Sequence, residues 1–108
     1  MDLNSTLTLN NGVQIPVLGL GTFRSKLGEE TYNAVKYALE AGYRHIDTAA
    51  VYGNEESVGE AIRDSKIPRE QIFVTTKLWN DDMRRDNQQR AIETSLKKLG
   101  LSYVDLYL

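Results

Sequence analysis

The chain has 108 residues, a net charge of −2 and no cysteine. Its hydrophobic content of 41% suffices for the core of one domain. The charge offers no basic surface for nucleic acid, and no apolar run approaches the length that spans a membrane. Without cysteine there is neither a disulfide nor a thiolate metal site, which fits the reducing cytoplasm, where we expect the protein.

Alternating hydrophobicity on either side of an Asn-Gly turn predicts a β-hairpin near the start of the chain. Its strands span Thr6–Leu9 and Val13–Ile15, and Gly12 closes the turn between them. An apolar segment rich in glycine follows Pro16 and predicts a further strand over residues 17–22.

After residue 22, segments with helical spacing alternate with short segments rich in β-branched and aromatic residues. Helices are predicted over residues 28–41, from Asn54 to the break at Ile67-Pro68, and over residues 84–99. Strands are predicted over Tyr43–Thr48, Ile72–Leu78 and Tyr103–Leu108. Asn54 is of a residue type that caps helices with its side chain, and we expect that role here.

Strands that alternate with helices across short loops predict an α/β fold with a parallel sheet. Two architectures share this pattern, an open doubly wound sheet and a (β/α)₈ barrel of the TIM type. Both bind ligands at the carboxyl ends of their strands.

The strand ends place Asp47 and Lys77 where neighbouring parallel strands would bring them together as an ion pair. Tyr52 follows Asp47 on the next loop. A phenol with a reference pKa of about 10 is a weak acid near neutral pH, and an adjacent ammonium stabilises its phenolate. The three residues could form a proton donor for a substrate oxygen. The simpler alternatives are a solvated ion pair and a tyrosine that only packs.

His45, the only histidine, lies on the same predicted strand as Asp47. It is most simply a hydrogen-bonded histidine of the core. The sequence contains no cluster of metal ligands, so we expect no metal site.

Four segments resemble the aldo-keto reductase family. The segment GYRHIDTAAVYGNEESVG, residues 42–59, is similar to the family's diagnostic motif. LNNGVQIPVLGLGTF resembles its N-terminal hairpin and first strand, IFVTTKLW its third strand, and LGLSYVDLYL its fourth. The resemblance implies a (β/α)₈ barrel closed at the bottom by the hairpin. It also implies reduction of aldehydes and ketones with NAD(P)H, with NADPH expected over NADH.

The same resemblance implies roles for individual residues. Tyr52 would protonate the carbonyl oxygen, Lys77 would assist it and Asp47 would pair with Lys77, as three members of the family's catalytic tetrad. Thr22, Asp47 and Lys77 would contact the cofactor. The substrate pocket would be lined by Phe23, where relatives often carry tryptophan, and by Val51 and Trp79.

The family's fourth strand continues into a segment with the tetrad's histidine, whereas this sequence ends at Leu108. We therefore expect residues 1–108 to be the N-terminal part of a barrel domain, a half-barrel of one hairpin, about four parallel strands and three helices, without its C-terminal half. By itself this chain is expected to be inactive and to self-associate through its open sheet. The partner of the enzyme would be a small carbonyl substrate, with neither nucleic acid nor membrane.

Two alternatives stay open. One is a non-catalytic half-barrel that acts as an assembly or binding module. The other is an open flavodoxin-like sheet, in which the hairpin would have no evident task.

Overall fold

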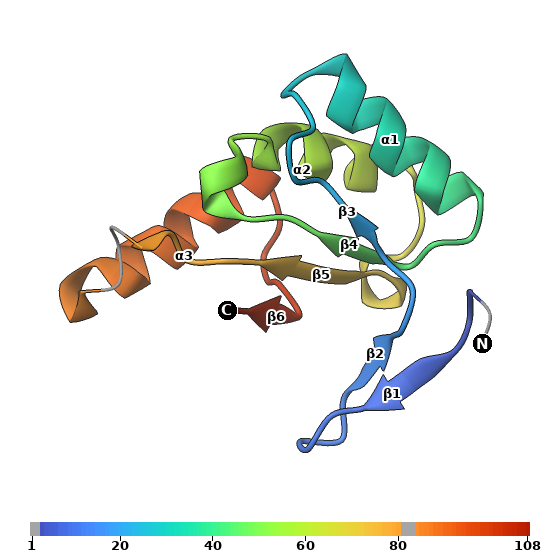
Figure 1. Cartoon of the computed structure of the whole chain (residues 1–108), viewed down its shortest axis with the longest axis horizontal. Helices are drawn as coiled ribbons and strands as arrows, with labels where there is room; N and C mark the ends of the chain where they lie inside the picture. Colours follow the sequence, from blue (N-terminus) through green and yellow to red (C-terminus); the bar gives the residue numbers. More distant parts are fainter. Residues whose placement is uncertain (1–2, 81–83) are drawn as a thin grey trace.

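The computed structural model describes residues 3–80 and 84–108, and its elements follow the predicted order (Figure 1). The strands are β1 (Thr6–Thr8), β2 (Gln14–Pro16), β3 (Leu20–Gly21), β4 (His45–Asp47), β5 (Phe73–Thr76) and β6 (Leu106–Tyr107). The α-helices are α1 (Glu29–Glu40), α2 (Glu55–Asp64) and α3 (Arg85–Leu99). Short 3₁₀ turns span Ala50–Tyr52 and Arg69–Gln71.

The four strands after the hairpin form one parallel sheet in the order β3-β4-β5-β6. Ile46 at the centre of β4 pairs with Leu20 on one side and with Val74 on the other, and Leu106 of β6 pairs with Thr75. Strand order equal to chain order is that of a barrel wall, whereas a flavodoxin-like sheet reverses its order at a switch point. The sheet therefore confirms the predicted half-barrel and contradicts the open-sheet alternative.

The strands at the two edges of this sheet are shorter than predicted. Residues 17–22 contribute only Leu20–Gly21, and residues 103–108 only Leu106–Tyr107. In the described part of the chain each of them is an edge strand of the sheet, so fewer of its backbone groups are fixed by strand pairing. Parallel contact nevertheless continues past β6, since the Leu78 N–H donates to the Leu108 carbonyl at 2.7 Å.

The predicted hairpin is confirmed, with β1 and β2 antiparallel. Gly12 adopts φ +87° in the turn, which glycine tolerates without strain. The Val13 N–H donates to Asn11 Oδ1 at 3.0 Å. At the other end of the hairpin, the Pro16 carbonyl lies 3.3 Å from His45 Nδ1, so the hairpin contacts the sheet where β4 begins.

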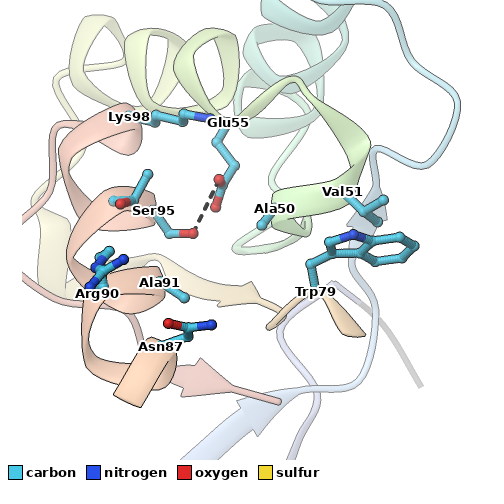
Figure 2. Close-up of a pocket in the computed structure, with 10 residues that line it drawn as sticks. Ala50, Val51, Glu55, Trp79, Asn87, Arg90, Ala91, Ser95 and Lys98 are labelled. Carbon is cyan, nitrogen blue, oxygen red and sulfur yellow. Dashed lines mark hydrogen bonds between the residues drawn. The ribbon is translucent and has the colours of Figure 1, made fainter. Parts of the chain in front are cut away.

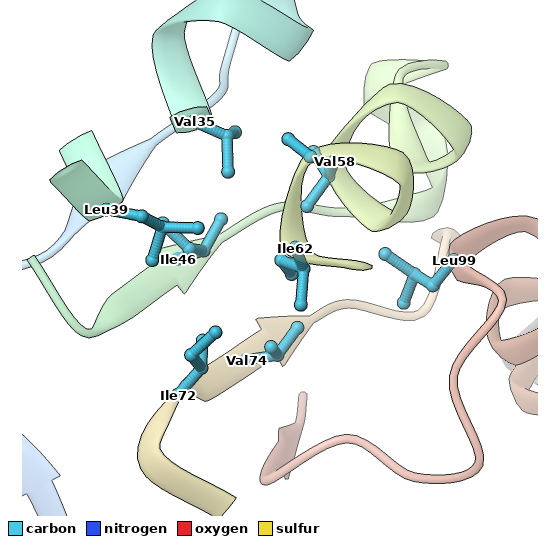
Figure 3. Packing of buried hydrophobic residues seen from close by; sticks show 9 residues of the cluster. Val35, Leu39, Ile46, Val58, Ile62, Ile72, Val74 and Leu99 are labelled. Carbon is cyan, nitrogen blue, oxygen red and sulfur yellow. The ribbon is translucent and has the colours of Figure 1, made fainter. Parts of the chain in front are cut away.

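The hydrophobic core lies on the face of the sheet that the helices cover (Figure 3). Ile46 and Val74 on the sheet are fully buried, as are Val35 on α1, Val58 on α2 and Leu99 on α3. Burial of one such side chain stabilises the fold by about 1.5–3 kcal/mol. Ala61 and Ile62 of α2 also belong to this cluster.

The opposite face of the sheet has less cover. Strand alternation places His45, Phe73 and Thr75 there, and the His45 ring packs edge-on against Phe73 with 5.0 Å between centroids. At the edge of the sheet formed by β6, this face is open to solvent at Leu108, which is 63% exposed.

Helices α2 and α3 meet at a position where only glycine fits. A Cβ atom at Gly59 would overlap the backbone of Leu99, far inside van der Waals contact. Arg63 of α2 also donates to the Leu99 carbonyl, which helps to satisfy the C-terminal end of α3. The spacing between the two helices is thus set by backbone contact.

We expect Gly59→Ala to destabilise the protein by about 3 kcal/mol, the upper end of the usual cost of overpacking. In an unpacked helix the same change would stabilise by about 1 kcal/mol. Chemical denaturation measures the difference. Gly21→Ala is the control, because a Cβ at Gly21 meets no atom within 4 Å. Equal stability of the two variants would contradict the close contact.

Candidate active site

Three polar side chains converge at the carboxyl ends of β4 and β5. Asp47 is the last residue of β4, Lys77 follows β5, and Tyr52 ends the 3₁₀ turn after β4. Lys77 Nζ donates to Asp47 Oδ2 at 2.7 Å and lies 3.4 Å from the Tyr52 hydroxyl. Its third contact is the Thr48 carbonyl at 3.3 Å. The structure thus brings Asp47, Tyr52 and Lys77 together, as their positions near the predicted strand ends suggested.

The Lys77–Asp47 pair lies at the surface of the site, with the side chains 31% and 34% exposed. Partial burial acts to lower the pKa of Lys77. Hydrogen bonds to Asp47 and Tyr52 and the negative charge of Asp47 outweigh it, so the pKa of Lys77 lies above its ordinary value. Lys77 is therefore a stable cation beside the Tyr52 hydroxyl.

Tyr52 is held between a cation and an aromatic ring. Lys77 Nζ lies 5.3 Å from the centre of the Tyr52 ring. On another side the Phe23 ring approaches it, with 5.3 Å between centroids and a tilt of 52°. Phe23 is 65% exposed, so the two rings form an open apolar surface beside the phenol hydroxyl.

Thr22, the expected cofactor contact, lies behind this surface and is 1% exposed. Its N–H donates to the Asp47 carbonyl at 3.0 Å, and its hydroxyl is 3.2 Å from the same oxygen. Its own carbonyl accepts from Asn54 Nδ2 at 2.8 Å. Each polar group of Thr22 is thus engaged inside the protein.

The residues expected to form the substrate pocket are divided between two places. Val51 and Trp79 border a cavity of about 290 Å³ beside α2 and α3 (Figure 2). Phe23 lies elsewhere and packs against Tyr52. The buried carboxylate of Glu55 borders the same cavity and accepts hydrogen bonds from Ser95 at 3.2 Å and from Thr76 at 2.7 Å.

Sequence reasoning missed the roles of Asn54 and Glu55. The prediction that Asn54 caps α2 with its side chain is wrong, since no such bond forms and the carboxamide turns into the protein instead. The sequence does not distinguish a capping asparagine from a buried one, because both stand directly before the helix. The available signal was the pair of threonines, Thr22 and Thr48, at the ends of neighbouring strands.

His45 is half-buried and hydrogen-bonded, with Nε2 3.0 Å from the Thr75 hydroxyl in addition to the Pro16 contact. Its ring thus belongs to the joint between hairpin and sheet. Among residues 3–80 and 84–108, no three His, Cys, Asp or Glu side chains are grouped to hold a metal ion. Within the same ranges no helix is long and apolar enough to cross a membrane.

The raised pKa of Lys77 predicts a pH dependence of stability. The ion pair stabilises the fold fully below the ordinary lysine pKa of 10.5, and this contribution is lost as the pH rises through the higher pKa of the folded state. Between about pH 10 and 12 the wild type should therefore lose more unfolding free energy than Lys77→Met. Lys36→Met on α1 serves as the control and should follow the wild type. Parallel curves for Lys77→Met and the wild type would refute the stabilised cation.

Comparison with known proteins identifies relatives over nearly the whole chain. The sequence profile described as "Aldo/keto reductase family" matches residues 17–108. The chain is 58% identical to aldehyde reductase YPR1 of Saccharomyces cerevisiae, over 97% of this chain and 33% of that protein.

Solved structures agree. An aldo/keto reductase from Brucella melitensis superposes with a TM-score of 0.94 at 54% identity, over 100% of this chain and 41% of that one. Bombyx mori aldo-keto reductase AKR2E4, in complex with NADP, gives 0.86 at 50% identity, over 99% and 38%. The chain thus spans about a third to two fifths of the length of these relatives. Sequence and structure agree that this chain belongs to the aldo/keto reductase family.

Proposed function

We propose that this chain is part of an enzyme that reduces small aldehydes and ketones to alcohols with NADPH. The observation that carries the proposal is the contact of Lys77 with both Asp47 and Tyr52 at the open end of a parallel sheet. A yeast relative is named an aldehyde reductase, and a silkworm relative was solved with NADP.

In the proposed reaction Tyr52 gives its hydroxyl proton to the substrate's carbonyl oxygen. Lys77 stabilises the phenolate that is left, and Asp47 holds the ammonium in place. NADPH supplies the hydride that adds to the carbonyl carbon. The Tyr52 phenolate then regains a proton from solvent, which the partial exposure of its neighbours Lys77 and Asp47 permits.

The residues present fit the nicotinamide end of such a cofactor. The Phe23 and Tyr52 rings offer an open apolar surface, and Asp47 and Lys77 border it with polar groups. Lys77 is already engaged by three oxygens, so it is not the ligand of a phosphate. Thr22 would support this surface from behind, because its polar groups are hydrogen-bonded to other residues inside the protein.

We further propose that residues 1–108 alone do not sustain turnover in the cytoplasm or in vitro. The catalytic tetrad that the family resemblance implies includes a histidine beside Asp47, Tyr52 and Lys77. The one histidine of this sequence is His45, and its ring nitrogens contact Pro16 and Thr75 instead of those three residues. Turnover of a generic aldehyde with NADPH by the 108-residue chain would contradict this and would also exclude a purely non-catalytic module.

Tyr52→Phe in the full-length protein should lower kcat for aldehyde reduction by at least about 100-fold, because it deletes the proton donor. NADPH affinity, measured by fluorescence quenching, should change little. Tyr37→Phe is the matched control, since Tyr37 is 62% exposed on α1 and should leave both quantities unchanged. Turnover by Tyr52→Phe at the wild-type rate would remove Tyr52 from the reaction.

The 108-residue chain should self-associate, because β3 and β6 form the two edges of the sheet in the described residues and the face away from the helices ends in exposed Leu108. Light scattering should give a mass above that of a monomer at micromolar concentration. Leu108→Lys should lower the association. Leu27→Lys should not, because Leu27, which is similarly exposed, lies before α1 and away from the sheet edges. A sharply melting monomer would refute the open sheet as an association surface.

A further inference from the structure

Asn54 is the most fully engaged polar side chain near the site, although its residue type suggested only a helix cap. It is 0% exposed and stands between Gly53 and the start of α2. Its Nδ2 donates to the Thr22 carbonyl at 2.8 Å and to the Ser25 carbonyl at 3.0 Å. Its Oδ1 accepts from the Thr48 hydroxyl at 2.9 Å. The Thr22 hydroxyl also approaches Oδ1, at 3.4 Å, so both donors and the acceptor are used.

Its partners Thr22 and Thr48 each contact the Asp47–Lys77 pair directly. The Thr22 N–H and hydroxyl both approach the Asp47 carbonyl. The Thr48 carbonyl is one of the three oxygens around Lys77 Nζ. A displacement of Asn54 would thus reach the backbone that carries Asp47 and the oxygen that helps to orient Lys77.

The carboxamide also clamps a strained turn. Arg24 lies between Thr22 and Ser25 and adopts φ +63°, a left-handed conformation that is strained for a residue with a side chain. The Ser25 N–H closes the turn on the Thr22 carbonyl at 3.0 Å. Asn54 Nδ2 holds the carbonyls at both ends of it. Without the carboxamide the turn would lose the bonds that offset its strain.

The clamped turn carries Phe23, and the segment before Asn54 carries Tyr52. Asn54 therefore joins the two backbone segments whose rings face each other across 5.3 Å. We propose that Asn54 is a positioning residue that fixes the Tyr52 hydroxyl relative to Phe23 and Lys77 in the carbonyl-reducing site. This inference rests on the proposed function for its catalytic part and on the contacts above for its structural part.

The test is Asn54→Asp in the full-length protein, an isosteric change that removes both donors and sets a carboxylate against two carbonyl oxygens. We expect kcat to fall by at least about tenfold with a smaller change in KM, because a displacement of about 1 Å can cost up to 100-fold in rate. In NMR, contacts between the Phe23 and Tyr52 rings should weaken, and amide exchange at Ser25 should accelerate. Asn10→Asp in the exposed hairpin turn is the matched control and should match the wild type throughout.

The outcomes separate the inference from the proposed function. Lost ring contacts together with a lower kcat support it. A wild-type kcat, or a lower kcat with intact ring contacts and slow Ser25 exchange, overturns it. If the wild type reduces no carbonyl, the proposed function fails, and the NMR readouts alone decide whether Asn54 holds the two segments.

If Asn54→Asp does not fold, Thr48→Val replaces it. This change removes only the Thr48 hydroxyl, the nearer of the two that donate to Asn54 Oδ1, and keeps the side-chain shape. A reduced kcat with weakened contacts between Phe23 and Tyr52 then supports the inference, and wild-type behaviour overturns it.

Discussion

The site depends on Asp47, which connects the end of β4 to the residues that follow β5 and β3. It does so with its carboxylate and with its backbone carbonyl. Its carboxylate holds the Lys77 ammonium, and its backbone carbonyl receives the N–H and hydroxyl of Thr22. An ion pair with this exposure contributes only about 0–1 kcal/mol to stability. Its value lies in orientation, because it sets the ammonium beside the Tyr52 hydroxyl at the point where β4 and β5 end.

Stability and chemistry occupy opposite sides of the same strands. The buried Ile46 and Val74 point to the helices, whereas their neighbours in sequence, Asp47 and Thr75, point the other way. A core on one side leaves the other side free to carry polar groups without losing the fold. The contact between Gly59 and Leu99 fixes the helix layer, so the strand ends rest on a rigid support.

Local rules predicted most of the fold and the central pair of the site. Asn-Gly gave the hairpin, hydrophobic spacing gave the three helices, and parallel pairing brought Asp47 to Lys77. Asn54 could not be assigned in this way, because a capping side chain and a buried clamp need the same residue at the same place. The sequence also could not predict that Phe23 lies apart from Val51 and Trp79, since this depends on how two loops fold in three dimensions. The edge strands were predicted too long because residue type does not reveal which strand will lie at the edge of a sheet.

Trp79 gives the molecule a spectroscopic property of its own. It is the only tryptophan in the sequence, it is 39% exposed, and it borders the cavity beside Val51, next in sequence to Tyr52. Indole emission shifts with the polarity around the ring, so all tryptophan emission from these 108 residues originates at one edge of the candidate site. Six tyrosines can pass excitation energy to that single ring. A molecule that fills the cavity would therefore shift the wavelength of the tryptophan emission, and this shift can be measured without an attached dye.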